Sequence, residues 1–217
     1  MKNLLGVVLV VWVGGCSHET SESDVVSYLE AHPESRAGIE KTAEGRTTDT
    51  TKIRHGDKPL TLLGPTLNVG APAPDVTVVD GNLGPVKLSA LKGKTVVLSV
   101  VPSIDTRVCE NQTLHLSQAM DQLPAGVEVM TVSRDLPFAQ SRFAQDPSIK
   151  TKMVSDYKGG DFGKAFGVEV QESGLLARSV WVIGPDGKIA YRQLVPDQGT
   201  EPDLEPVIAA VKKAAGA

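Results

Sequence analysis

The sequence predicts an α/β domain with a mixed central β-sheet. Short β-branched runs such as Thr95–Val101 and Val127–Ser133 alternate with segments whose apolar residues recur at helical spacing. Near the end, the turn sequence Gly184-Pro185-Asp186-Gly187 separates two further apolar runs and predicts a β-hairpin. Alternating strands and helices favour parallel pairing, and a hairpin adds antiparallel strands, so one sheet is expected to contain both kinds of pairing.

The first strands of the domain are expected as two hairpins. Gly64-Pro65 is a turn signal between apolar runs, and residues 80–84 form a second one. Pro102 ends the central strand, because proline donates no hydrogen bond to a ladder. The expected strands of this half are Pro59–Leu63, Leu67–Val69, Val76–Val79, Val86–Leu88 and Thr95–Val101, with a short turn at Ser89–Lys94.

Capping residues mark the ends of the helices expected in the second half. Thr106 is a good N-cap, Pro137 suits the first position of a helix, and Gly167 suits the position after a last turn. The expected helices begin after Thr106 and span Phe138–Gln145, Phe162–Phe166 and Asp203–Ala215, and the further strands are Val127–Ser133, Lys152–Val154, Arg178–Ile183 and Lys188–Leu194.

The composition is ordinary for a globular domain preceded by an extension. The 217 residues are 41% hydrophobic and 22% charged, with a formal net charge of −4. This charge offers no basic surface for nucleic acid, so no nucleic-acid partner is expected. The four histidines and two cysteines lack the spacing of a zinc site, and neither a metal nor a cofactor is expected.

The N-terminus, residues 1–16, is interpreted as a targeting segment. Lys2 precedes the apolar run Leu4–Val13, which has the length of a signal-peptide core and is too short to span a membrane. Val13-Gly14-Gly15-Cys16 resembles the lipobox of bacterial lipoproteins, which implies that Cys16 becomes the lipidated first residue. Ser17 resembles an outer-membrane sorting signal, so the protein is expected to be a lipoprotein of the outer membrane that faces the periplasm. An ordinary secretory signal with a chance cysteine is the alternative.

Residues 17–52 are interpreted as a polar tether and residues 53–217 as the folded domain. The tether is rich in Ser, Thr, Glu and Asp and poor in large apolar residues. Such a composition buries too little surface to offset the entropy of ordering. The alternative is that this segment docks onto the domain.

Cys109 is the centre of the functional interpretation. It follows the strand that Pro102 ends and falls in the first turn of a helix capped by Thr106, whose hydroxyl is expected to face the backbone N–H of Cys109. The thiolate is the reactive form of cysteine, and a helix N-terminus favours an anion. A buried, inert core cysteine is the alternative that this placement leaves open.

Several motifs in order resemble one protein family. Pro102-x-x-x-Thr106-x-x-Cys109 resembles the active-site signature of the peroxiredoxins, and residues 100–109 resemble the bacterial thiol peroxidases, or atypical two-cysteine peroxiredoxins. The resemblance covers about Ile53 to Lys213 and implies a thioredoxin-like fold, a homodimer, and reduction of hydrogen peroxide and organic hydroperoxides by a thiol. Further matching segments are Ser133–Phe143, Leu176–Arg178, Gln193–Val195 and Glu201–Asp203.

The resemblance also assigns roles within the site. Cys109 is expected to attack the peroxide, Thr106 and Arg178 to bind it, and Pro102 to shield the thiolate from water. Spacing alone does not choose the cation, and the resemblance implies Arg178. The candidate cations are Arg107, Arg134, Arg142, Arg178 and Arg192. Asp105 and Glu110 are expected to be solvated or paired elsewhere, and the sequence predicts no role for Gln140.

One position departs from the family pattern. The family's resolving cysteine follows Ser-Arg-Phe, where this chain has Ala144. The sulfenic acid of Cys109 is therefore expected to be recycled by an external thiol donor. A disulfide reductase would need a nearby cysteine pair, which is absent from the sequence. A non-catalytic lipoprotein that senses or binds peroxide is the alternative function.

Overall fold

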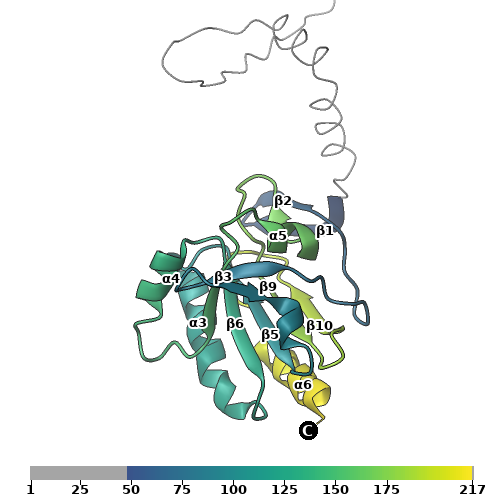
Figure 1. Ribbon diagram of the computed structural model, residues 1–217. Helices are drawn as coiled ribbons and strands as arrows, with labels where there is room; N and C mark the ends of the chain where they lie inside the picture. Colours follow the sequence, from purple (N-terminus) through teal and green to yellow (C-terminus); the bar gives the residue numbers. More distant parts are fainter. Residues whose placement is uncertain (1–47, 217) are drawn as a thin grey trace, which may run out of the picture. The chain divides into compact units, whose positions relative to one another are not determined.

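The computed structural model describes the backbone of residues 48–216 and the side chains of residues 53–216. The expected signal segment 1–16, with Cys16, and most of the expected tether 17–52 lie outside the described residues. The described chain forms a three-stranded and a seven-stranded sheet, and helices cover both faces of the larger sheet (Figure 1).

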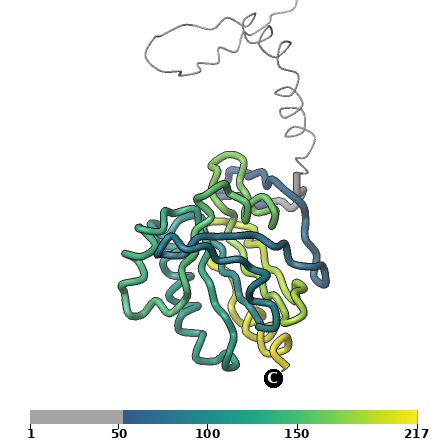
Figure 2. Tube along the Cα trace, viewed as in Figure 1, coloured from purple at the N-terminus to yellow at the C-terminus, as the bar shows by residue number. Residues whose placement is uncertain are grey.

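The larger sheet is mixed, as predicted, with the strand order β10-β9-β5-β6-β7-β3-β4. β5 pairs in parallel with β6, and β6 with β7, whereas the other neighbours are antiparallel. Figure 2 traces the crossovers that the parallel pairs require, through α3 (Arg107–Ala119) and α4 (Pro137–Phe143). The strands of this sheet are β3 (Thr77–Asp80), β4 (Pro85–Lys87), β5 (Val96–Val100), β6 (Glu128–Ser133), β7 (Lys152–Ser155), β9 (Ser179–Ile183) and β10 (Ile189–Leu194).

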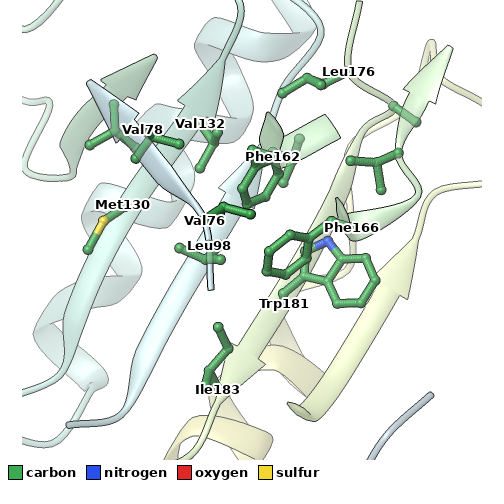
Figure 3. Close-up of a cluster of buried hydrophobic side chains, with 14 of the residues drawn as sticks. Val76, Val78, Leu98, Met130, Val132, Phe162, Phe166, Leu176, Trp181 and Ile183 are labelled. Atoms are coloured by element: carbon green, nitrogen blue, oxygen red, sulfur yellow. The ribbon is translucent and has the colours of Figure 1, made fainter. Parts of the chain in front are cut away.

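Apolar clusters bury β5 on both faces. Val97 lies in one cluster with residues of α3 and α6 (Leu204–Ala215), and Leu98 lies in the opposite cluster with residues of α5 (Asp161–Phe166). In Figure 3, Phe162 and Phe166 of α5 stack with ring centroids 4.3 Å apart, and Phe166 meets the edge of Trp181 at 5.2 Å. This burial fixes the carboxyl end of β5, from which the chain enters α3.

The N-terminal hairpin exists, and its predicted strand Pro59–Leu63 is confirmed as β2 (Lys58–Leu63), but the predicted partner of that strand was wrong. β1 (Thr48–His55) pairs with β2 across Gly56-Asp57, and β2 also pairs with β8 (Glu169–Val170). The expected strand at 67–69 is irregular, and β1 begins inside the segment interpreted as a tether. The reason is close packing: a side chain on Gly167, which ends α5, would collide with the carbonyl oxygen of Pro65. Gly64-Pro65 therefore makes a backbone contact instead of a hairpin turn.

Most other element ends agree with the capping signals. α4 begins with Pro137 and ends at Phe143, somewhat earlier than expected, and Asp203 caps α6 by accepting a bond from the Glu205 N–H at 3.0 Å. Two short 3-10 helices, η1 (Leu88–Leu91) and η2 (Met120–Gln122), were not predicted. Within the described residues, no helix has the length and apolar character needed to cross a membrane.

Candidate active site

Cys109 lies where the sequence placed it, in the first turn of α3. Its N–H, like that of Glu110, donates to the Thr106 carbonyl oxygen at 3.0 Å, and Thr106 is the N-cap residue. The Cys109 side chain is a free thiol with 0% exposure. The sulfur therefore lies in the first turn of a helix and away from bulk water.

The Thr106 hydroxyl contacts the sulfur and does not cap the helix. Its Oγ1 lies 2.9 Å from Cys109 Sγ and 3.1 Å from the Ser103 carbonyl oxygen, with no side-chain bond to the helix N–H groups. The expected bond to the Cys109 N–H was therefore wrong. A hydroxyl carries one hydrogen, so Thr106 donates either to the sulfur or to Ser103 at any moment.

Arg178 supplies the cation beside the sulfur. It directly precedes β9, is 2% exposed, and donates from Nη2 to Cys109 Sγ at 3.3 Å. Nη1 donates to the Gln112 side-chain oxygen at 2.6 Å, and Nε donates to the Gln198 carbonyl oxygen at 3.1 Å. A guanidinium has five N–H groups, so these three bonds leave one N–H at Nη1 and one at Nη2 for a further acceptor.

The Cys109 sulfur differs from the other groups that contact the Arg178 guanidinium. Among the side chains that the structure describes, no carboxylate lies within ion-pair distance of Arg178, and its other acceptors are neutral amide oxygens. A buried guanidinium without a counter-charge is costly. Cys109 Sγ, 3.3 Å from Nη2, is the one group that the described residues place in contact with the guanidinium and that can carry a negative charge.

The other arginines considered do not contact the sulfur. Arg134 pairs with Asp156 at 3.4 Å and Glu169 at 2.9 Å, and Arg192 lies over the Trp181 ring at 5.7 Å. Arg107 and Arg142 are exposed. The acidic neighbours Asp105 and Glu110 are exposed as well, as expected. Of the candidate cations, the structure brings only Arg178 to Cys109 within the described residues.

Gln112 is a site residue that sequence reasoning missed. It is 1% exposed, and its Nε2 donates to Ser99 Oγ of β5 at 2.8 Å while its oxygen accepts from Arg178. It follows Cys109 by about one helical turn, so both side chains lie on the same face of α3. In the sequence, the only indication of this role is that a polar residue stands three positions after the cysteine, on the same helix face.

Asp135 braces the loop between β5 and α3. One carboxylate oxygen accepts from Ser103 Oγ at 2.7 Å, and the other accepts from the Ile104 N–H at 2.8 Å. Ser103 in turn accepts from Thr106, so the brace extends to the residue that contacts the sulfur. Pro102 is half-buried at the start of this loop, and its role as a shield stays a prediction.

The opposite side of Cys109 is apolar and includes α4. Cys109 belongs to a small cluster with Ile104 and Met153, and Ala139 and Phe143 of α4 pack against that cluster. The next residue, Ala144, is the exposed C-cap of α4. Gln140 is a structural residue, because its Nε2 ties α4 to Ser133 Oγ and the Val154 carbonyl oxygen, both at 2.9 Å.

The fold and the buried cysteine at the β5–α3 junction define a thioredoxin-like protein of the peroxiredoxin class. The family model described as Redoxin matches residues 68–208. A peroxiredoxin-like protein from Aquifex aeolicus superposes with a TM-score of 0.71 at 37% identity, covering 77% of this chain and 98% of that chain. The thiol peroxidase from Chromobacterium violaceum, at 16% identity and a TM-score of 0.69, supports the fold alone; it covers 76% of this chain and 97% of that chain.

The curated relatives narrow the class. The thiol peroxidase of Halalkalibacterium halodurans is 45% identical over 157 residues, covering 72% of this chain and 94% of its own length. The thiol peroxidase of Bacillus subtilis is 43% identical over 155 residues, covering 71% of this chain and 92% of its own length. The chain therefore belongs to the thiol peroxidase family of peroxiredoxin-type enzymes.

Proposed function

We propose that this protein reduces hydrogen peroxide and organic hydroperoxides by a cycle that uses one protein cysteine, Cys109, and an external thiol. The observation that carries the proposal is the position of the buried sulfur, 2.9 Å from Thr106 Oγ1 and 3.3 Å from Arg178 Nη2. This arrangement offers a thiolate, donors for a peroxide and a cation for the charge that develops as the oxygen–oxygen bond breaks.

In the first step, a lone pair of the Cys109 thiolate attacks one oxygen of the peroxide. A sulfur–oxygen bond forms and the oxygen–oxygen bond breaks, which gives a sulfenic acid and a departing hydroxide or alkoxide. The sulfur is oxidised and the peroxide reduced, and the leaving oxygen takes a proton to become water or an alcohol. The remaining N–H groups of Arg178 stabilise the negative charge on that oxygen.

In the second step, an external thiol regenerates the cysteine. Its thiolate attacks the sulfenic sulfur, forming a mixed disulfide and displacing hydroxide, which takes a proton to become water. A second thiol then attacks the mixed disulfide, frees Cys109 and leaves with the first thiol as a disulfide. The sequence supports this route because its only other cysteine is Cys16, and Ala144 stands where the family pattern has the resolving cysteine. Cys109 is 0% exposed, so the loop at 102–106 or the packed end of α4 has to move to admit the thiol.

Membrane anchoring is the second part of the proposal. The lipobox-like segment ending at Cys16 supports a periplasm-facing lipoprotein, most simply in the outer membrane, and the family resemblance supports a homodimer. A peroxidase held at a bilayer meets hydroperoxides of membrane lipids, so bulky organic hydroperoxides are proposed among its substrates. Globomycin should cause unprocessed precursor to accumulate, and recovery of free protein in the periplasm would contradict the anchor.

Peroxide consumption by the purified chain from Ser17 onward tests the catalytic part. With a small dithiol as the only reductant, we expect steady consumption of hydrogen peroxide and of an organic hydroperoxide. With no thiol, consumption should stop after a single turnover. A protein that binds peroxide but consumes none with any thiol would favour the peroxide-sensing or binding alternative.

A further inference from the structure

Among the described residues, the segment that follows β10 leaves the N–H of Arg178 without a main-chain acceptor. Leu194 pairs with Ser179 in the β9–β10 ladder, and the Val195 N–H donates to the Arg178 carbonyl oxygen at 3.0 Å. The Pro196 carbonyl oxygen instead accepts from the Arg54 N–H at 2.8 Å. The buried N–H of Arg178 therefore needs another acceptor, since an unsatisfied buried N–H is costly.

Gln198 provides that acceptor and holds Arg178 at a second point. Its side-chain oxygen accepts from the Arg178 N–H, and its main-chain oxygen accepts from Arg178 Nε at 3.1 Å. Its Nε2 donates to the Val195 carbonyl oxygen at 2.6 Å, and the residue is 5% exposed. One residue thus contacts both the backbone and the guanidinium of Arg178, while that guanidinium contacts Cys109 Sγ.

The first strand of the domain fixes Gln198 in turn. The Gln198 N–H donates to the Arg54 carbonyl oxygen at 2.8 Å, and Arg54 Nη1 pairs with Asp197 Oδ2 at 2.9 Å. Arg54 belongs to β1, which is remote in sequence from both Arg178 and Cys109. The direction of the guanidinium therefore depends on a chain of contacts that runs from β1 through Gln198.

We propose that Gln198 is a positioning residue for peroxide reduction, which acts by aiming the Arg178 guanidinium at Cys109 and the bound peroxide. The inference rests on the proposed function and deepens it. Small displacements of a group that stabilises a transition state cost rate even when the fold survives. Loss of the Gln198 side chain keeps the main-chain oxygen that accepts from Arg178 Nε, but it removes the two side-chain bonds, to the Arg178 N–H and to the Val195 carbonyl oxygen, that hold this oxygen in place. It should therefore slow the chemistry at Cys109 by way of Arg178.

A double-mutant cycle in the chain from Ser17 onward tests the proposal. Gln198→Leu should slow oxidation of Cys109 by hydrogen peroxide by about tenfold or more. In an Arg178→Lys background, Gln198→Leu should change the remaining rate by less than about twofold, because the fork that Gln198 aims is absent. The melting temperature should fall on Gln198→Leu in both backgrounds, because the main-chain N–H of residue 178 loses its acceptor either way.

Gln193→Leu is the matched control. Gln193 lies on β10, and its side-chain oxygen has no hydrogen-bond partner among the described residues. The same chemical change there should leave the oxidation rate unaltered. Equal slowing by Gln198→Leu in both backgrounds, or a lower melting temperature with an unchanged rate, would reduce Gln198 to a structural residue and overturn the proposal.

Two further measurements keep the test independent of folding and of the proposed function. If Gln198→Leu does not fold, Gln198→Glu retains an acceptor for the Arg178 N–H but adds an anion that competes with the thiolate for the guanidinium. It should slow alkylation of Cys109 by iodoacetamide at neutral pH, and an unchanged alkylation rate would contradict the proposal. If the wild type consumes no peroxide, the proposed function fails, and the alkylation rates of the same variants still test Gln198.

Discussion

Cys109 lies between two unlike surroundings, a polar side and an apolar side. On the polar side, Thr106 and Arg178 both contact the sulfur, and Gln112 links Arg178 to β5 by a further pair of hydrogen bonds. On the apolar side, the sulfur packs with Ile104 and Met153, and the end of α4 covers them without a polar contact to Cys109 among the described residues.

The difference separates the two halves of the proposed cycle. Oxidation needs charges and donors fixed in place before the peroxide arrives, and the polar side provides them. Regeneration needs access to a buried sulfur, and apolar packing at a partly exposed helix end is easier to open than hydrogen bonds centred on the buried Gln112 and Arg178. α4 also carries Ala144, where no thiol is available to react with the sulfenic acid.

Removing the sulfur should have the largest effect. Cys109→Ser replaces the thiolate by a hydroxyl that does not ionise at neutral pH, so peroxide consumption should fall to the uncatalysed background. The measurement is hydrogen peroxide remaining over time with a small dithiol as reductant. Cys16→Ser in the full chain is the matched control and should retain the rate. Activity that survives Cys109→Ser would place the chemistry elsewhere.

Removing the cation should have the next largest effect. Arg178→Ala takes away the charge beside the sulfur and the donors to the peroxide, and the rate of Cys109 oxidation should fall by about 10²–10³-fold. Arg178→Lys should restore only part of the rate, because a point charge replaces a planar fork. The exposed Arg142 of α4 offers a control, and stopped-flow rates that fall equally for Arg142→Ala would contradict the assignment.

A thiol on the apolar side should change the product of oxidation. Ala144→Cys places a cysteine next to Phe143, which packs against the cluster that contains Cys109. After treatment with peroxide, we expect an intramolecular disulfide between Cys109 and the new residue, provided that the last turn of α4 unwinds to bring the sulfurs together. Non-reducing peptide mapping detects the link. A stable sulfenic acid in this variant would show that the end of α4 does not open.

A smaller effect is expected from Asp156, which lies outside both regions. Burial raises the pKa of this carboxyl group, and the N–H groups of Gly163 and Phe162 together with Arg134 oppose the rise. Between the ordinary pKa and the raised one, Asp156 is protonated in the native state and ionised in the unfolded state. Its contribution to the free energy of unfolding therefore becomes less favourable as pH rises through this range. Urea unfolding across that range should show the negative contribution in the wild type and not in Asp156→Asn.

Carboxyl groups with lowered pKa values oppose Asp156 in the same range. The hydrogen bond from the Gly199 N–H lowers the pKa of Asp197, and the positive charge of Arg54 lowers it further. The stabilisation from Asp197 is therefore present above its ordinary pKa and is lost as pH falls through the lowered pKa. The test therefore compares how steeply the free energy of unfolding changes with pH in the wild type and in Asp156→Asn. Identical slopes would contradict the raised pKa of Asp156.

Local signals predicted the part of the site that is continuous in sequence. Pro102 and Thr106 specify a strand end and a helix start, and both depend only on backbone chemistry within a few residues. Arg178 was different, because its contact with Cys109 joins residues that the sheet brings together from far apart in sequence. Spacing gave no reason to prefer it, and only the family resemblance identified it.

Buried amides were missed for a related reason. In the sequence, Gln112 and Gln198 have the character of surface residues. Only the fold shows that both are buried and accept hydrogen bonds from Arg178. The N-terminal hairpin was misplaced because Gly64-Pro65 has the composition of a turn but serves a close backbone approach to Gly167. The true turn, Gly56-Asp57, was a weaker signal than Gly64-Pro65.

Trapping the first product on Cys109 tests the central claim most directly. The chain from Ser17 onward, treated with one equivalent of hydrogen peroxide in the presence of dimedone and analysed by intact and peptide mass spectrometry, should carry a single adduct on Cys109. At most, a crosslink between the Cys109 residues of two chains should accompany it. An unmodified Cys109 after the peroxide is consumed, or an adduct on another residue, would contradict the account.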